Sequence, residues 1–580
     1  MYEQALQNRE DLKQYGSNAL LLFALEMRFG IEDIHTVAAD ALTDGHDDKK
    51  CDLVYINVDE GSAVIAQGYL SSSSSRKEAP ANKASDLNTA AAWLLSRELS
   101  ELPSRIKPAA TQLRDALENG QIKTIQFWYV HNLPESQNVK NELRTVQGSA
   151  SSSLRQLLGN APLLPNVTAI EVGSSQLDDW YKALTTPILV VEEFEVDIIG
   201  GYPINSEDWS AFVTAIPAEW LHRIFNEYKD DLFSANIRGY LGSRKADANI
   251  NNGIKTTAEN DASHFWVYNN GLTILTHNFK FNEASNKLFI KGISIVNGAQ
   301  TTGAVGSLSS APNSAAMVPA RFVQCNNRDV ITRIIQFNNS QNQVEAPDFR
   351  SGDDIQKRLR SEFNSIPSVT YLGGRRGGYD DRMRRPTNLL PSDTAGQALA
   401  AFHGDVLIAY NDKSKIWVSD SLYSRFFSNR TTARHIVFAY SLLRAVEERK
   451  YQLSNDRELT NKQEKTLSFF RNRGATFLLA SAIAASLEII LDKPVHDKFS
   501  MIFKDNISPQ EAIRIWEPII AISGSFSERL LVGLEGGLNN TERVRRAISD
   551  FTSFMEATSE PNSSIYSNFS SNIQADNLVL

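Results

Sequence analysis

The sequence predicts a mixed α/β protein built from three consecutive regions, and three patterns carry that prediction. Helix-like and strand-like segments alternate over residues 1–196, as in a mixed sheet covered by helices. Residues 197–410 are rich in Asn and Gly and mix hairpin signals with strand-to-helix turns, which indicates an α+β region. Residues 411–580 carry apolar side chains at spacings of three and four, which is typical of helices with one buried face. We therefore expect three domains with these boundaries.

The first region opens with an amphipathic helix and continues with strand-like runs separated by helices. A serine run at 71–75 separates the first pair of strands from the helices that follow. The expected elements are a helix at 18–29, strands at 52–58 and 63–69, helices at 84–99 and 102–119, and strands at 123–130 and 167–172. This order predicts a central mixed sheet.

In the second region, Asn270-Gly271 lies between two strand-like runs and predicts a hairpin turn in which Gly supplies the positive φ. The third region is expected to be helical at 433–450, 465–491 and 508–522. Its longest apolar run, 475–487, falls short of the ~20 residues that cross a bilayer, so it predicts a buried helix. The Ser- and Asn-rich stretch from about residue 557 onwards is expected to fray.

The composition limits the classes of function. Hydrophobic residues make up 42% of the 580 residues and charged residues 22%, as in a globular protein. With a net charge of −9, nucleic acid can be held only by a local basic patch. The two cysteines exclude a disulfide framework and a Cys-rich zinc module, and they fit a reducing cytoplasm. The polar N-terminal segment is unlike a signal peptide, so we expect a soluble, cytoplasmic protein without a membrane partner.

The densest group of reactive side chains lies at 44–69. Residues 59–62 predict a turn between the first two strands, and folding about it sets Asp52 opposite Gln67 and residue 69, which share a face. A carboxylate and a second oxygen ligand then lie close together, as Mg²⁺ requires. The alternative is that the acidic segment is a solvated loop and that Gln67 is an edge residue.

This pattern resembles the PD-(D/E)XK restriction-endonuclease-like nucleases. The resemblance implies that Asp52 is the first metal ligand and that Gln67 stands at the (D/E) position. The lysine expected two residues later is replaced by Tyr69, and a neutral phenol stabilises developing negative charge poorly.

Other side chains would complete this set. A lysine brought in by the fold would have to replace the missing one, and the candidates are Lys83, Lys77 and Lys50. Glu26 on the first helix is the candidate for a further metal ligand, by the same resemblance. The implied cofactor is Mg²⁺ or Mn²⁺.

Four segments of the second region carry a further resemblance. They are LFSANIRGYLG at 232–242 with NINNGI at 249–254, FWVYNNGLTI at 265–274, ISIVNGAQTT at 293–302 and IQFNNSQNQV at 335–344. Together and in this order they resemble the abortive infection phage resistance (AIPR) family, over about residues 197–427, and a nuclease-like N-terminal block is the usual companion there. The resemblance implies a bacterial antiviral role for a protein that acts when phage infects.

The third of these segments predicts a phosphate site. A strand turns through Asn297 and Gly298, and a helix opens around Gln300, so free backbone N–H groups face outward. The segment also resembles the DGQHR motif of ParB-like domains, which bind nucleotides or nucleic-acid backbone at this place. The terminal Arg of that motif is absent, so a phosphate would depend on backbone N–H groups or on Arg238. The alternative is a plain strand-to-helix turn that binds nothing.

A basic run is the best local candidate for a contact with nucleic acid. Arg375, Arg376 and Arg382 stand among glycines, and arginine forks grip phosphate in a bidentate manner. Asp380 and Asp381 offset part of this charge, and a solvated loop is the alternative.

Two functions stay open. The first is an antiphage, metal-dependent nuclease that cuts DNA or RNA, with helices for assembly, a homodimeric state and a phage-encoded trigger. The second is a catalytically degenerate sensor that signals through assembly, because Tyr69 stands where a lysine is expected. Internal P-loop ATPases, zinc enzymes and serine hydrolases are not expected, since their motifs do not occur in the sequence.

Overall fold

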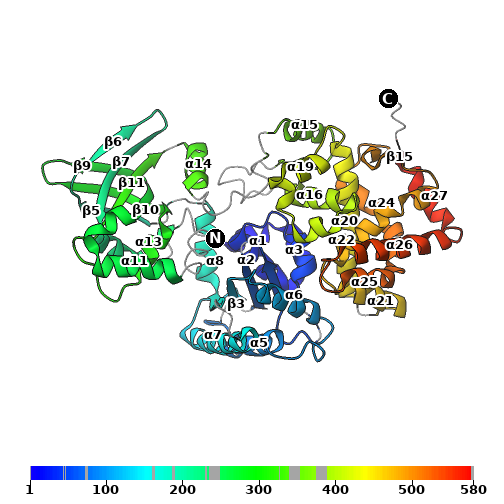
Figure 1. Cartoon of the computed structure of the whole chain (residues 1–580), viewed down its shortest axis with the longest axis horizontal. Helices are drawn as coiled ribbons and strands as arrows, with labels where there is room; N and C mark the ends of the chain where they lie inside the picture. Colours follow the sequence, from blue (N-terminus) through cyan, green and yellow to red (C-terminus); the bar gives the residue numbers. More distant parts are fainter. Residues whose placement is uncertain are drawn as a thin grey trace.

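The protein has a mixed α/β architecture with a helical C-terminal region, as the sequence predicted (Figure 1). The computed structural model describes residues 2–575 except 44, 46, 60, 72–75, 160–163, 186–187, 189, 229–231, 234–247, 326, 339–349, 351–352, 374–387 and 457. None of the helices in these ranges is long and apolar enough to cross a membrane.

The N-terminal domain is built on a four-stranded mixed sheet. Strands β1 (Leu53–Asn57), β2 (Ser62–Tyr69), β3 (Thr124–His131) and β4 (Asn166–Val172) lie side by side in that order. The β1–β2 pair is antiparallel, and β2–β3 and β3–β4 are parallel. The turn between β1 and β2 includes Gly61 at a φ of +62°, which favours glycine.

Helices cover both faces of this sheet, because alternate residues of each strand belong to different cores. Ile65 and Phe127 face the core formed with α4 to α7, whereas Val64 and Trp128 face the core formed with α2 and α8. The helices of the domain are α1 (Tyr2–Gln7), the 3-10 helix η1 (Glu10–Asn18), α2 (Ala19–Phe29), α3 (Ile34–Ala41), α4 (Ala81–Ser85), α5 (Leu87–Leu95), α6 (Lys107–Glu118), α7 (Gln137–Leu158) and α8 (Ser174–Thr185).

The central region holds a seven-stranded sheet in the order β5-β10-β8-β11-β7-β6, with β9 also paired to β10. Only β8 and β11 are parallel neighbours among its described strand pairs. The strands are β5 (Val190–Asp197), β6 (Gly201–Asn205), β7 (Trp209–Pro217), β8 (Leu272–Thr276), β9 (Asn278–Asn282), β10 (Lys287–Asn297) and β11 (Met317–Cys325). The helices are α9 (Ala218–Tyr228), α11 (Ala248–Asn260), α12 (Phe265–Tyr268), α13 (Ala299–Gly306) and α14 (Arg328–Asn338). Helices α9, α11 and α13 pack on one face of the sheet and α14 on the other.

The helical region has one large core to which most of its helices contribute. Its helices are α15 (Asp354–Phe363), α16 (Ser392–Phe402), α17 (Val406–Asn411), α18 (Lys415–Val418), α19 (Asp420–Phe426), α20 (Ala433–Asn455), α21 (Asn461–Phe470), α22 (Ala475–Ala485), α23 (Leu487–Leu491), α24 (Pro509–Gly524), α25 (Leu531–Leu534), α26 (Thr541–Ala557) and α27 (Ser563–Ser571). Short strand pairs join β12 (Thr370–Tyr371) to β13 (Leu389–Leu390) and β14 (Met501–Phe503) to β15 (Ile573–Ala575).

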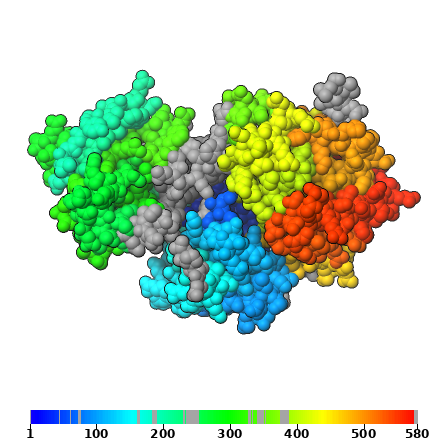
Figure 2. Space-filling model, viewed as in Figure 1, coloured from blue at the N-terminus to red at the C-terminus, as the bar shows by residue number. Residues whose placement is uncertain are grey.

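The helical region folds back onto the N-terminal domain, although the central region separates the two in sequence. Thr394 Oγ1 donates a hydrogen bond to Asp33 Oδ2 over 2.7 Å, and Arg473 Nη2 donates to the backbone oxygen of Val54 over 2.5 Å. Figure 2 shows the N-terminal domain between the central region at one end of the molecule and the helical region at the other.

Three expectations from the sequence are wrong. The run before Asn270-Gly271 is a helical turn, α12, so this pair does not join two strands, although Gly271 has the expected positive φ of +80°. The segment 465–491 is not one helix, because α21 ends at Phe470 and α22 begins only after Gly474, which takes a φ of +76°. The described part of the C-terminal stretch is folded, since α27 buries Tyr566 and Phe569 and β15 pairs with β14.

The regions also meet at other positions than the expected boundaries 197 and 411. Strand β5, which begins at Val190, already belongs to the central sheet because it pairs with β10. Leu359 and Phe363 of α15 pack in the same core as the C-terminal helices, so the helical region begins well before residue 411.

Candidate functional site

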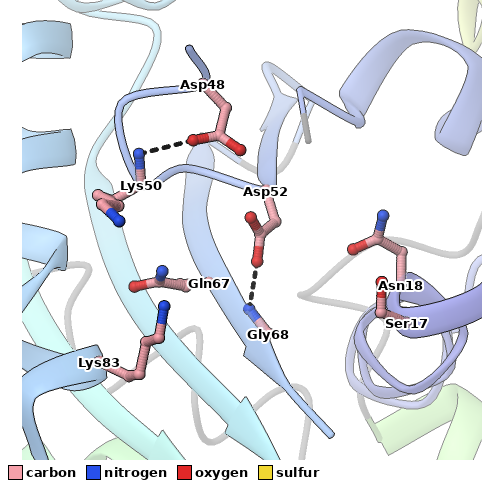
Figure 3. Close-up of a pocket in the computed structure, with 8 residues that line it drawn as sticks. All are labelled: Ser17, Asn18, Asp48, Lys50, Asp52, Gln67, Gly68 and Lys83. Carbon is pink, nitrogen blue, oxygen red and sulfur yellow. Dashed lines mark hydrogen bonds between the residues drawn. The ribbon is translucent and has the colours of Figure 1, made fainter. Parts of the chain in front are cut away.

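The β1–β2 hairpin brings Asp52 and Gln67 together. Leu53 pairs with Ala66, so Asp52 lies opposite Gln67, and the Asp52 N–H donates to the Ala66 oxygen over 2.9 Å. The backbone N–H of Gly68 donates to Asp52 Oδ2 over 2.7 Å, which fixes the orientation of the carboxylate (Figure 3).

Gln67 has a buried side chain whose oxygen lacks a partner. The residue is 5% exposed, and Gln67 Oε1 accepts no hydrogen bond from the described part of the chain. Leaving a buried acceptor unpaired costs about 1–3 kcal/mol. This atom is therefore ready to accept a bond from a cation or a donor of a ligand.

Asp52 ends a short strap, residues 47–52, with an unusual backbone. Asp47, Lys49 and Lys50 have φ values of +65°, +55° and +67°, which cost L residues about 1–3 kcal/mol each. Asp48 holds the strap in this shape, because its Oδ1 accepts from the Lys50 N–H over 2.9 Å and its Oδ2 from the Gly45 N–H over 3.1 Å.

A cavity of about 260 Å³ opens in front of these residues. Asp52, Gln67 and Gly68 line its centre, with two lysines on one side and the start of α2 on the other (Figure 3). Its described lining residues are Ser17, Asn18, Asp48, Lys50, Asp52, Gln67, Gly68 and Lys83.

Two of the three lysines suggested by the sequence reach this cavity. Lys50 comes from the strap and Lys83 from α4, and each ammonium lies 3.8 Å from Asp86 Oδ2. Lys77 is exposed and does not line the cavity. Tyr69 is also absent from the lining, and its hydroxyl accepts a hydrogen bond from Arg76.

Glu26 is not brought to the cavity. It lies two turns beyond Asn18 on α2, about 12 Å further along the helix axis. Its carboxylate forms an ion pair with the Arg9 guanidinium over 2.5 Å.

The donor set of the cavity is small but suits Mg²⁺. Mg²⁺ is usually bound by one or two carboxylates and keeps several waters and substrate oxygens. Asp52 supplies one carboxylate and Gln67 Oε1 a neutral amide oxygen, whereas the described residues contain no group of three or more His, Cys, Asp or Glu side chains that could hold a metal ion.

In the central region, the expected strand-to-helix turn is present. Strand β10 ends at Asn297, Gly298 has a φ of +96°, and α13 begins directly after it, with Gln300 in its first turn. A Cβ at Gly298 would lie 2.2 Å from Leu272 Cδ2, so close packing against β8 demands glycine. This requirement explains the glycine without any ligand.

An arginine that the sequence analysis did not single out stands beside this turn. Arg321 on β11 pairs with Thr273 on β8, which in turn pairs with Asn297. Arg321 Nε donates to Thr273 Oγ1 over 2.7 Å, and Arg321 Nη2 donates to Asn338 Oδ1 over 2.5 Å. Only the pairing of β8 between β10 and β11 reveals this neighbourhood, and no local motif marks it.

The remaining basic candidates of the sequence analysis, Arg238, Arg375, Arg376 and Arg382, lie outside the described residues.

Comparison with known proteins gives one family. The model of the family described as AIPR protein matches residues 233–524, which is just over half of the chain. No curated protein and no solved structure matches the chain. The matched segment spans the larger part of the central region and most of the helical region and leaves out the N-terminal domain. The four ordered motifs and this match agree, and the chain belongs to the AIPR protein family.

Proposed function

We propose that this AIPR protein is an antiphage, abortive-infection effector whose N-terminal domain hydrolyses phosphodiester bonds of nucleic acid with a divalent metal ion. Membership in the AIPR family suggests the antiphage role. The nuclease part rests on one observation above all, the buried and unpartnered Gln67 Oε1 of the residue opposite Asp52, in a cavity that Lys83 also reaches.

Each residue of the cavity would have a distinct task. Asp52, oriented by the Gly68 N–H, and Gln67 would hold Mg²⁺ or Mn²⁺. The metal ion, when bound, supplies positive charge beside the phosphate and makes a water molecule more acidic. Lys83 would take the task of the lysine missing at position 69, because an ammonium beside the non-bridging oxygens stabilises developing negative charge. Lys50 adds a second positive charge on the same side.

The test is cleavage of plasmid DNA and of structured RNA by the purified full chain with Mg²⁺, Mn²⁺ or EDTA. We expect metal-dependent cleavage that Asp52→Asn abolishes and Lys83→Met lowers at least tenfold. Lys77→Met is the matched control, since Lys77 is exposed near α4 but outside the cavity, and it should cleave like the wild type. Cleavage that persists in Asp52→Asn would refute the proposed site.

A second candidate is a catalytically degenerate sensor, and Tyr69 together with the small acidic donor set favours it. A sensor would bind a phage product or nucleic acid and signal through assembly. If the protein is a sensor, the Asp52→Asn variant should protect cells against phage as well as the wild type does. If the protein is a nuclease, the same variant should lose this protection. Light scattering of the purified chain with and without nucleic acid tests the homodimer and any assembly.

A further inference from the structure

A second cavity, of about 50 Å³, lies where the helical region meets the N-terminal domain. Arg105 and Asp40 line it from the N-terminal domain, and Lys450, Arg471 and Arg473 line it from the helical region. Four cations thus face one acid among the described residues of its wall.

The three guanidinium groups are anchored by neutral oxygens. Arg105 Nε donates to the Thr43 backbone oxygen over 2.9 Å, and Arg471 Nη1 donates to Ser104 Oγ over 3.1 Å. In the part of the chain that the structure describes, no carboxylate lies within ion-pairing distance of the guanidinium groups of these two arginines. They are held in place without being neutralised.

Arg473 is bound in the same way. Its Nη1 donates to Gln112 Oε1 over 2.6 Å and its Nη2 to the Val54 oxygen, while its buried Nε has no acceptor among the described residues. Lys450 is the one cation with a carboxylate, since its Nζ lies 3.5 Å from Asp40 Oδ1.

Like charges gathered in a partly buried cavity repel each other. Burial and then the Arg105 charge lower the pKa of Arg471, while Glu464 acts in the opposite direction. Burial lowers the pKa of Lys450 in spite of Asp40, and the Arg473 charge adds to this effect. A bound anion would relieve this repulsion and accept the hydrogen bonds that the arginines still have to give.

We propose that this cavity is a binding site for a single phosphate group, held by Arg105, Arg471 and Arg473 between the two folded parts of the chain. Its volume of about 50 Å³ suits one tetrahedral oxyanion, so the rest of a larger ligand would lie outside the cavity. The ligand class is therefore inorganic phosphate or the phosphate of a small phosphomonoester. Arginine forks match the oxygens of such a group better than lysine does.

The test is thermal unfolding of the full chain in sodium phosphate against sodium chloride of equal ionic strength. A ligand that binds only the folded protein raises the Tm with its concentration, so we expect a rise within about 20 mM phosphate. Arg471→Gln and, separately, Arg105→Gln should weaken the apparent affinity at least tenfold. Arg449→Gln is the matched control, because Arg449 is only partly buried, lies on the same helix as Lys450 and does not line the cavity, and it should respond like the wild type.

Further measurements distinguish inorganic phosphate from a phosphomonoester as the ligand, and they show which of the two cavities binds it. A response to inorganic phosphate or to a nucleoside 5′-monophosphate that disappears in Arg471→Gln supports the site and identifies its ligand. Asp52→Asn should keep the response, since Asp52 lies in the other cavity. No response of the wild type, an undiminished response in both arginine variants, a loss of the response in Asp52→Asn, or a response to an oligonucleotide alone would overturn the proposal.

Discussion

Replacing Gln67 by Leu should make the metal-free protein more stable and at the same time remove its response to metal. In the wild type the buried Gln67 Oε1 has no partner in the described part of the chain, and such an acceptor costs about 1–3 kcal/mol. Leu has a similar volume and leaves no buried oxygen, so most of this cost should be recovered. For a domain of this size, 1 kcal/mol corresponds to about 2–4 °C in Tm, so the gain is at most roughly 2–12 °C.

Gln126 provides the matched control on the neighbouring strand. It is 4% exposed, close to the value for Gln67, but its Oε1 accepts a hydrogen bond from Trp128 Nε1 over 3.0 Å. Gln126→Leu leaves the indole N–H unpaired and should lower the free energy of unfolding by about 1–3 kcal/mol. The two substitutions are chemically identical and are expected to change stability in opposite directions.

The assay is calorimetric unfolding in EDTA and in increasing Mg²⁺ or Mn²⁺. Stabilisation by a metal ion bound to the native state grows as RT ln(1 + [L]/Kd), about 1.4 kcal/mol at ten times the Kd. Wild type should show this increase and Gln67→Leu should not. If Gln67→Leu is less stable than the wild type in EDTA, the oxygen already has a partner and the argument for the metal site fails.

Three further predictions follow from other parts of the fold. Thr394→Val removes a hydrogen bond to the buried Asp33 carboxylate between the helical region and the N-terminal domain. The free energy of unfolding measured by chemical denaturation should therefore fall by about 1.5–3 kcal/mol. An unchanged denaturation midpoint would contradict this. Burial raises the pKa of Glu447 to about 7, so the free energy of unfolding of the wild type should fall as the pH rises from about 4.5 to 7. Glu447→Gln should make the free energy of unfolding depend less on pH in this range. Equal slopes against pH in wild type and variant would refute the prediction. Gly298→Ala should destabilise the central sheet by well over 1 kcal/mol, since the added Cβ has no room. Gly120→Ala is the control, because Gly120 also has a positive φ but lies in open space, so this substitution should cost only the backbone strain. Equal losses of Tm in the two variants would contradict the packing argument.

The sequence predicted the parts of the site that depend on local rules. Turn residues fixed the β1–β2 hairpin, and strand alternation then placed Asp52 opposite Gln67. The sequence could not choose Lys83 over Lys77, because the distance of each lysine from Asp52 depends on how the connection to α4 folds. It suggested Glu26, yet the pairing of that carboxylate with Arg9 became visible only in three dimensions.

No pattern in the sequence indicated that the helical region packs against the N-terminal domain. Complementary groups such as Asp33 and Thr394 are 361 residues apart, and neither residue marks its partner. The helical turn at 265–268 was mistaken for a strand because its aromatic and β-branched residues favour strands locally, whereas the tertiary structure decided otherwise. The folded part of the C-terminal stretch was missed because two buried aromatic side chains outweigh a polar composition.

Because the helical region packs back onto the N-terminal domain, the contacts between them form late in synthesis. A ribosome adds about 5–20 residues per second, so Asp33 leaves the ribosome roughly 20–70 s before Thr394 does. Throughout that interval the strand that starts next to Asp52 lacks the hydrogen bond from Arg473 to Val54. A chain that ends before Thr394 acquires neither contact. The hydrogen bond from Arg473 to β1 therefore forms only after most of the chain has been synthesised.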